Sequence, residues 1–319
     1  MKRAAELLRA GEVVALPTET VYGLAANARD EKAVAKIFQI KGRPANNPII
    51  VHVAGVDMAQ RCVADWPANA VSLARAFWPG PLTLVLPRAK DIPDNVTAGG
   101  ATVGVRWPGH PLIQAVMREC GFPLAAPSAN LSGQISPTNA GHVRKQLGDK
   151  IPLIIDGGQS QVGIESTVLD LTASAPEVLR PGMIHAESLA AVVGSVRNFK
   201  AGAQRGTLLR SPGRLDKHYA PRARLLVLHW DDEADLKAQL TARHAPPAAC
   251  HVIAHTRIPA GIDAANVCVI PHDAEAFARA IYGELHRGDE AGAEWIVVEV
   301  PPDLPEWSAI ADRLRRAAA

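Results

Sequence analysis

One short segment concentrates side chains that could bind a polyanion. KGRPANNPIIVH (41–52) carries Lys41 and Arg43 ahead of an apolar run and ends on His52. Two neighbouring cations with amides beside them suit the oxygens of phosphate groups. The same pattern is typical of a solvated basic turn that leads into a buried strand. The segment alone leaves both interpretations open.

The familiar phosphate-binding loops are absent from the sequence. It contains no GxxxxGK[ST], and no predicted strand leads into GxGxxG. The metalloprotease and hydrolase signatures HExxH and GxSxG are also missing. A phosphate site would therefore have to be assembled from cations, hydroxyls and backbone amides that separate segments contribute.

Four further segments could supply such groups. They are PTETVYGL (17–24), APSANLSGQISPT (126–138), IIDGGQSQVGIESTVLD (154–170) and LRPG (179–182). The first two follow predicted strands, and ligands of α/β proteins commonly bind at strand ends. Each segment could equally be a polar turn or loop. A lone arginine such as Arg180 is more often structural than functional.

A metal pair is conceivable in CHVIAH (250–255). His251 and His255 are four residues apart and would share one face of a strand. No neighbouring carboxylate or third ligand completes a set, so no metal site is predicted.

Composition indicates an ordinary globular protein. The chain is 48% hydrophobic and 21% charged, as in ordinary globular proteins. Its 319 residues are enough for two domains, or one large one, with an adequate core. Aromatic residues make up only 4%, which argues against a nucleic-acid surface built on stacked rings. The four cysteines form no CxxC pair and are predicted to be reduced. Without a secretory signal or a long apolar run, we expect a soluble, cytoplasmic protein with no membrane partner.

Charge is distributed unevenly along the chain. Residues 1–198 hold 19 basic and 16 acidic side chains, whereas residues 199–224 hold seven and one. Residues 225–319 hold eight and 15. A basic connector therefore joins a nearly neutral region to an acidic one, and the acidic region carries no signal for direct nucleic-acid binding.

The elements that must position these side chains follow from periodicity. Helices are predicted over 3–10, 30–40 and 111–119, with Asp30 as an N-cap. Strands are predicted over 13–16, 49–53, 82–86, 102–106, 124–126, 151–155, 167–171 and 177–179. Their irregular alternation predicts an α/β fold with a twisted mixed sheet and helices packed around it.

From residue 224 the alternation becomes regular. Strands over 224–230, 250–255, 266–270 and 294–300 alternate with helices over 232–244 and 273–288, and a last helix runs to the C-terminus. This pattern predicts a smaller Rossmann-like domain. The predicted domains are 1–198 and 224–319, joined by a basic linker over 199–223.

Taken together, the segments resemble the YrdC/Sua5 family of threonylcarbamoyl-adenylate synthases, in its two-domain Sua5 form. The matching pieces, in chain order, are PTETVYGL, KGRPANNPIIVH, WPGPLTLVL (78–86), TAGGATVGVRWPGHP (97–111), APSANLSG, IIDGG, ESTVLD, LRPG, SPGRLDKHYAP (211–221) and EWSAIADRLRRAA (306–318). The resemblance spans nearly the whole chain, so no single motif has to carry it.

The resemblance implies a nucleotidyltransferase reaction. ATP, L-threonine and bicarbonate would give threonylcarbamoyl-AMP and pyrophosphate, with Mg²⁺ accompanying the triphosphate. The product would feed the threonylcarbamoyl modification of adenosine 37 in tRNAs that read codons beginning with A. A tRNA threonylcarbamoyl-transferase complex would be the downstream acceptor.

The resemblance also implies roles for individual residues. Lys41 and Arg43 would be the catalytic pair, meeting the phosphates and the bicarbonate-derived carboxylate. The ATP side would comprise Lys41, Arg43, Asn47, Thr102, Ser128, Asn130, Ser136, Arg180, His218 and Tyr219. The threonine side would comprise Thr20, His52, Arg106, Ala126 and Ser166. The planar fork of Arg106 suits a carboxylate.

The linker is expected to cover the site, with His218 and Tyr219 excluding water from a labile adenylate. Arg214-Leu215-Asp216-Lys217 departs from the family pattern, because it puts an acid where such linkers are often more basic or aromatic.

Two other functions are compatible with such a fold. One is a non-catalytic RNA-binding module, which requires a broad basic surface. The other is a different carbamoyl transferase, as in hydrogenase maturation proteins. Those proteins carry additional zinc-finger and acylphosphatase-like domains, and neither pattern occurs in this sequence.

Overall fold

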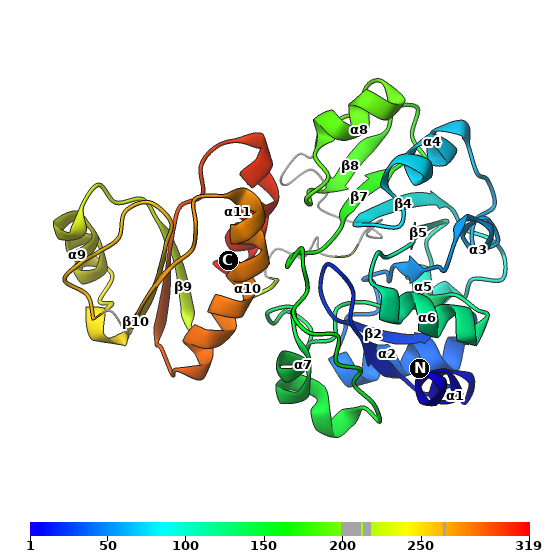
Figure 1. The fold of residues 1–319 in the computed structure, drawn as a ribbon, viewed down its shortest axis with the longest axis horizontal. Coiled ribbons are helices and arrows are strands. Elements are labelled where there is room, and N and C mark those ends of the chain that lie inside the picture. Colours follow the sequence, from blue (N-terminus) through cyan, green and yellow to red (C-terminus); the bar gives the residue numbers. More distant parts are fainter. Residues whose placement is uncertain (199–211, 213–217, 264–265) are drawn as a thin grey trace. The chain divides into compact units, whose positions relative to one another are not determined.

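The computed structural model describes residues 1–198, 212, 218–263 and 266–319 (Figure 1). The chain divides into two compact units. The first comprises residues 1–132 and 136–214, and the second comprises residues 133–135 and 215–319. The domain boundaries predicted at residues 198/199 and 223/224 stay a prediction.

An eight-stranded sheet organises the first unit, in the order β1-β2-β6-β3-β5-β4-β7-β8. The β3–β5 and β4–β7 pairs are parallel and the other pairs are antiparallel. The strands are β1 Val14–Leu16, β2 Gly23–Asn27, β3 Val51–His52, β4 Leu82–Pro87, β5 Thr102–Arg106, β6 Leu124–Ala125, β7 Thr167–Asp170 and β8 Glu177–Arg180. The predicted mixed sheet is confirmed.

Helices surround this sheet. They are α1 Lys2–Arg9, α2 Glu31–Lys41, α3 Val56–Gln60, α4 Ala68–Phe77, α5 Asp94–Thr97, α6 Pro111–Cys120, α7 Ala140–Leu147 and α8 Ala186–Val193, with a 3-10 turn at Gly148–Lys150. The predicted N-cap of α2 is confirmed, because Asp30 accepts hydrogen bonds from the backbone N–H groups of Lys32 and Ala33. Gly42 ends α2 with a φ of 59°, a left-handed conformation that glycine adopts without strain.

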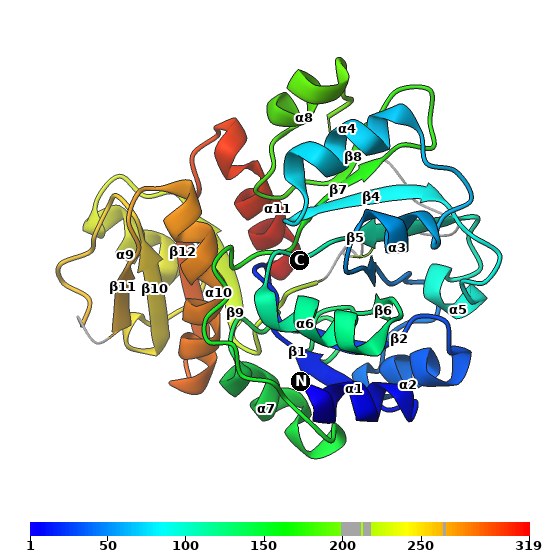
Figure 2. The same cartoon turned by 45° about the vertical axis from the view of Figure 1, so that its right-hand side comes forward.

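The two faces of the sheet are covered differently. One face packs against apolar side chains of α2, α3, α4, α7 and α8 in the main core. On the other face, α1 and α6 cover only β1, β2 and β6 (Figure 2). Among the described residues, the half of that face formed by β3, β5, β4, β7 and β8 holds a small apolar cluster, comprising Ile50, Val85, Val168 and Leu179.

Two predicted strands need correction. Residues 151–155 form no strand, and only an isolated bridge joins Ile154 to Ala15. Pro152 lacks the N–H group that a ladder requires. The strand predicted over 49–53 is reduced to β3, because the N–H of Ile49 bonds to Val96 O in α5 instead of to a strand.

The second unit contains a four-stranded parallel sheet in the order β11-β10-β12-β9. Its strands are β9 Arg224–Leu228, β10 Cys250–Ala254, β11 Val267–Val269 and β12 Trp295–Glu299, and its helices are α9 Glu233–Ala242, α10 Ala274–Glu290 and α11 Ser308–Ala317. Figure 1 shows α9 on one side of the sheet and α10 and α11 on the other. The predicted Rossmann-like domain is confirmed.

Among the described residues, no helix combines the length and the apolar character that crossing a membrane requires.

Candidate functional site

Polar side chains gather on the half of the large sheet that α1 and α6 leave uncovered. The pairing register of the strands determines which side chains share this face. His52 lies opposite Arg106 in the parallel β3–β5 pair, and Thr83 lies opposite Val168 in the β4–β7 pair. The face carries His52, Thr83, Gly104, Arg106 and, just before β7, Ser166; we call it the site face. Side chains alternate along a strand, so the neighbouring valines of β5 point into the core instead.

Arg106 is fixed at the end of β5. Its side chain is 4% exposed and donates hydrogen bonds to Thr20 Oγ1 at 3.0 Å and to Gly80 O at 3.2 Å. The hydroxyl of Thr20 lies 2.8 Å from that of Thr18. Two residues predicted for threonine binding, Thr20 and Arg106, are therefore in direct contact.

Glu19 completes this arrangement, and the sequence analysis assigned it no role. Its Oε1 lies 2.8 Å from Arg106 Nη2. Burial by itself would raise the pKa of Glu19, but the Arg106 charge and hydrogen bonds, including one from the Gly109 N–H, hold it below the usual value. Glu19 is thus an anion at neutral pH. Its position between Thr18 and Thr20 in PTETVYGL was the available signal.

His52 is a neutral imidazole in this environment. Burial and the nearby Arg106 charge lower the pKa of His52 well below 6.5. Its Nδ1 atom is buried and makes no hydrogen bond to any residue that the structure describes. A buried polar atom of this kind is suited to a ligand.

Lys41 joins two segments that are distant in sequence. It ends α2, is 2% exposed, and its Nζ donates to Ser128 O at 2.5 Å and to Asn130 O. Burial, and to a lesser extent the Arg43 charge, lower the pKa of Lys41 well below 10.5. Lys41, Ser128 and Asn130, all predicted for the ATP side, are brought together.

PTETVYGL lies against the same loop. Ser128 forms an antiparallel bridge with Gly23, and the N–H of Ala129 donates to Tyr22 O at 2.7 Å. These backbone bonds link the loop that Lys41 contacts to the segment that carries Glu19 and Thr20.

Arg43 and Asn47 form a compact pair. Arg43 Nη2 donates to Asn47 Oδ1 at 2.8 Å and to Pro48 O at 2.6 Å, and its Nε donates to Asn47 O at 3.0 Å. The Nδ2 of Asn47 is buried and bonds to no other described residue. This turn therefore presents a fixed guanidinium beside an amide donor that has no acceptor among the described residues.

Ser166 and Arg180 are also in contact, although they were predicted for different substrates. Arg180 donates to the Ser166 hydroxyl from Nη2 and to its carbonyl from Nε, each at 3.1 Å. The Ser166 hydroxyl also lies 2.8 Å from Thr83 Oγ1. Arg180 Nη1 is 3.5 Å from Pro212 O, which belongs to the predicted linker.

The other predicted residues of the first unit lie nearby. Ser136 donates a hydrogen bond to Glu165 at 2.6 Å, and Glu165 is a further buried carboxyl group to which no role was assigned. Thr102 begins β5 and lines a narrow cavity with Pro48, Thr97, Gly104 and Pro212, among others. Ala126 is buried, and its N–H donates to Ile50 O at 3.1 Å.

His218 and Tyr219 belong to the second unit. The N–H of His218 donates to Arg316 O, and the Tyr219 ring stacks 5.9 Å from that of Tyr282. The guanidinium of Arg313 lies 5.5 Å from the Tyr219 ring centre. Their predicted place over ATP stays a prediction, and linker residues 199–211 and 213–217 lie outside the described residues.

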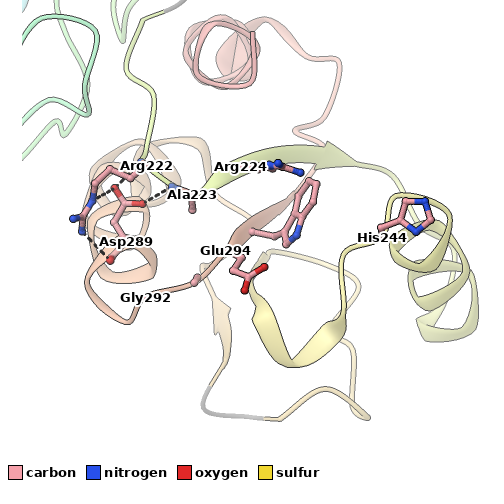
Figure 3. A pocket seen from close by; sticks show the side chains of 9 residues that line it. Arg222, Ala223, Arg224, His244, Asp289, Gly292 and Glu294 are labelled. Carbon is pink, nitrogen blue, oxygen red and sulfur yellow. Dashed lines mark hydrogen bonds and ion pairs between the residues drawn. The ribbon is translucent and has the colours of Figure 1, made fainter.

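The second unit has a shallow depression of about 520 Å³ of its own (Figure 3). Its arginines already have partners: Arg222 pairs with Asp289, and the Arg224 guanidinium lies 5.0 Å from the centre of the Trp295 ring. Glu294 also lines it. With two acids beside two arginines, the depression lacks the excess positive charge that an RNA-binding surface requires.

Comparison with protein families gives two matches that together span nearly the whole chain. Residues 6–182 match a family described as "Telomere recombination", which groups Sua5, YciO and YrdC proteins. Residues 184–319 match "Threonylcarbamoyl-AMP synthase, C-terminal domain".

Individual relatives agree with these matches. The chain is 42% identical to a threonylcarbamoyl-AMP synthase of Bacillus subtilis, over 99% of this chain and 92% of the relative. It is 39% identical to that of Pyrococcus abyssi, over 99% and 93%. A crystal structure of P. abyssi Sua5 complexed with L-threonine superposes with a TM-score of 0.92 at 38% identity, over 99% of this chain and 93% of that one.

Proposed function

Because the chain belongs to the YrdC/Sua5 family and is an enzyme of the threonylcarbamoyl-AMP synthase class, we propose that its substrates are ATP, L-threonine and bicarbonate. The threonine amine would attack the bicarbonate carbon, a C–O bond of bicarbonate would break, and its oxygen would leave as water with the amine proton, which gives N-carboxy-threonine. A carboxylate oxygen of that carbamate would then attack the α-phosphorus of ATP. The bond from this phosphorus to the bridging oxygen would break, so that pyrophosphate leaves and threonylcarbamoyl-AMP remains.

The observation that carries this proposal is the arrangement of buried cations along one connected set of segments. Lys41 is bonded to the Ser128 loop, which is bonded to the segment of Thr20, which is bonded to Arg106. Both ends of the site thereby belong to one hydrogen-bonded framework. A preorganised framework of this kind stabilises charge without reorganising during the reaction.

The phosphate end suits a nucleophile that is already an anion. The carbamate needs no strong base for its attack on phosphorus, so catalysis rests on positioning and on neutralising charge. Lys41 and Arg43 would supply that neutralisation. The Asn47 amide group, whose hydrogens have no acceptor in the part of the chain that the structure describes, would donate to a phosphate oxygen. Ser136 and Arg180 would complete the ATP side.

The other end suits a free amino acid. Threonine is a zwitterion at neutral pH, and the ion pair of Arg106 and Glu19 offers it one cation and one anion. Its carboxylate would bind the Arg106 fork, and its ammonium group would lie towards Glu19. The Nδ1 of neutral His52, which has no partner among the residues that the structure describes, would bond to the amine or hydroxyl.

Magnesium would accompany the triphosphate instead of binding a preformed protein site. Within the described ranges, no group of three or more His, Cys, Asp or Glu side chains is placed to hold a metal. Mg²⁺ commonly binds through substrate phosphates and water with one or two carboxylates. It would neutralise charge on the leaving pyrophosphate, and Lys41 and Arg43 would neutralise charge on the remaining phosphate oxygens.

The product would pass to a tRNA threonylcarbamoyl-transferase complex, and the reaction would take place in the cytoplasm. The first statement rests on the chemistry of the product, because a mixed carbamic–phosphoric anhydride is a group donor that an acceptor enzyme must consume. The second repeats the expectation drawn from the sequence.

The proposal is tested by following pyrophosphate release from ATP and Mg²⁺ while threonine and bicarbonate are omitted in turn. We expect release only when both are present, and at least a hundredfold loss in Lys41→Ala and Arg43→Ala. Lys36→Ala, which removes a partly exposed lysine of the same helix that pairs with Glu12, should retain activity. Release that ignores threonine would make the chain an ATP pyrophosphohydrolase and would refute the proposal.

A further inference from the structure

Two histidines and a threonine converge at the carboxyl edge of the sheet in the second unit. His255 and Thr256 follow β10, and His272 follows β11 after a short turn. The Nδ1 atoms of the two imidazoles lie 3.0 Å apart, and Thr256 Oγ1 is 2.8 Å from each. None of these residues takes part in the proposed reaction.

The pairing differs from the one that sequence spacing raised. His251 lies within β10, 3.8 Å from Glu284 of α10, whereas His255 lies beyond the strand end. The carboxyl edge of a parallel α/β sheet is where such folds bind ligands. The trio of His255, Thr256 and His272 therefore occupies a favourable place for a site.

The orientation of His255 is fixed by its other nitrogen. Its Nε2 lies 3.2 Å from Val300 O, and a carbonyl can only accept, so Nε2 carries the hydrogen. In the neutral ring that metal binding requires, Nδ1 carries the lone pair, and this atom faces His272 and Thr256. Histidines that bind metals usually donate their second ring N–H to a carbonyl or carboxylate in this way.

The surrounding structure holds these donors in place. Trp307 and Phe277 pack against the His255 ring, with ring centres 5.4 and 5.7 Å away. The Glu299 carboxylate is 1% exposed and accepts the backbone N–H groups of His255 at 2.8 Å and Thr256 at 2.9 Å. The loop after β10 is thus pinned to the end of β12 without a contribution from His272, which is exposed.

We propose that His255 Nδ1, His272 Nδ1 and Thr256 Oγ1 bind a divalent transition-metal ion of the Zn²⁺ type. Two imidazole nitrogens 3.0 Å apart can both lie about 2.0–2.1 Å from one ion. The threonine oxygen and water would complete the coordination. No third His, Cys, Asp or Glu joins the pair among residues 1–198, 212, 218–263 and 266–319, so the site is open and would bind more weakly than a closed structural zinc site.

Binding would join the loops that follow β10 and β11. This would stabilise the carboxyl edge of the second unit, because an ion that binds only the folded state raises its stability. The alternative is that the two histidines and the hydroxyl simply hydrogen-bond to one another, and the experiment separates these outcomes.

The test uses the untagged, full-length chain freed of metal with a chelator. Zn²⁺ affinity is measured by competition with a chromophoric chelator, and coordination geometry by Co²⁺ absorption. We expect wild type to bind one Zn²⁺ per chain. In His272→Ala, Zn²⁺ should bind at least tenfold more weakly, and the visible absorption bands of bound Co²⁺ should be lost. His229→Ala is the matched control, since it removes an exposed histidine after β9 that pairs with Asp231.

Circular dichroism and thermal unfolding without metal would establish that His272→Ala is folded, as expected for an exposed side chain. Zn²⁺ should then raise the melting temperature of wild type and His229→Ala but not of His272→Ala. Equal affinity in wild type and His272→Ala, or no specific Zn²⁺ binding to wild type, would overturn the proposal and leave a hydrogen-bonded pair. These measurements do not depend on synthase activity, so they stand whether or not the proposed function holds.

Discussion

Glu19 Oε1 and Arg106 Nη2 lie 2.8 Å apart, and the two side chains are 14% and 4% exposed. Arg106 is therefore half of a buried ion pair instead of an isolated cation. A substrate that binds there must satisfy both partners, as a zwitterionic amino acid can. This relationship explains how the site can hold a buried arginine at the end of β5 before any substrate arrives.

Glu19→Gln should destabilise the protein strongly. It leaves the Arg106 charge buried without its counterion, which typically costs about 3–5 kcal/mol in the free energy of unfolding. Glu12→Gln is the control, because Glu12 and Lys36 form a much more accessible pair at the same 2.8 Å distance, with side chains 43% and 37% exposed, and solvent-accessible pairs contribute about 0–1 kcal/mol. Urea unfolding of both variants checks the prediction. Equal, small losses would show that the Glu19–Arg106 pair has no special importance.

ATP binding should be accompanied by proton uptake at Lys41. Burial and the Arg43 charge depress the pKa of Lys41 in the free protein, and triphosphate oxygens beside Nζ would raise it again. Protons are taken up when binding raises a pKa. Calorimetry at about pH 8.5, in two buffers of different ionisation enthalpy, measures that uptake. Lys41→Met should abolish it and Lys36→Met should not. Unchanged uptake in Lys41→Met would place the phosphates elsewhere.

His52 should make stability depend on pH. Its folded pKa lies well below the unfolded value of 6.5, so the unfolded chain binds more protons between the two values. Relative to His52→Gln, the free energy of unfolding of wild type should therefore be highest above pH 6.5. This advantage should be lost as pH falls through the lowered pKa. Chemical denaturation at several pH values gives this difference. A difference that stays constant from neutral to acidic pH would contradict a neutral His52, and His229→Gln provides an exposed control.

Asp30→Ala should lower stability while leaving the chemistry intact. The Asp30 carboxylate caps α2 through two backbone N–H groups at 2.9 and 3.1 Å. Loss of such a cap costs about 1 kcal/mol. Because Lys41 lies at the opposite end of α2, turnover per folded molecule should be unchanged. Asp65→Ala, at an exposed loop position, should change neither quantity; a fall in turnover per folded Asp30→Ala molecule would show that the cap also positions Lys41.

Periodicity predicted the second unit well and the first less completely. From residue 224 onwards, apolar strands alternate regularly with amphipathic helices, and each predicted element there is present. In the first unit, β2 was not predicted, because Gly23–Asn27 is built from glycine, alanine and other residues of low strand propensity. α4, α7 and α8 were also missed. The run over 151–155 looked like a strand because its apolar pattern outweighed Pro152.

Motifs could single out candidate site residues, whose roles stay a prediction, but could not predict their contacts. Sequence spacing gives no reason for Lys41 to meet the carbonyls of Ser128 and Asn130, since sheet pairing and loop packing bring these segments together. For the same reason Glu19 was overlooked: its partner lies on a different strand. The assignment of Ser166 and Arg180 to separate substrates likewise did not anticipate that the two side chains touch.

The central claim is that bicarbonate carbon ends in an adenylate that also contains threonine. The most direct measurement is mass spectrometry of the product formed from ATP, Mg²⁺, L-threonine and ¹³C-bicarbonate. The expected product is threonylcarbamoyl-AMP whose mass exceeds that of the unlabelled product by one unit, and whose amount falls sharply in Arg43→Ala. Threonyl-AMP without the extra carbon, or AMP alone with no labelled adenylate even at the earliest times, would contradict it.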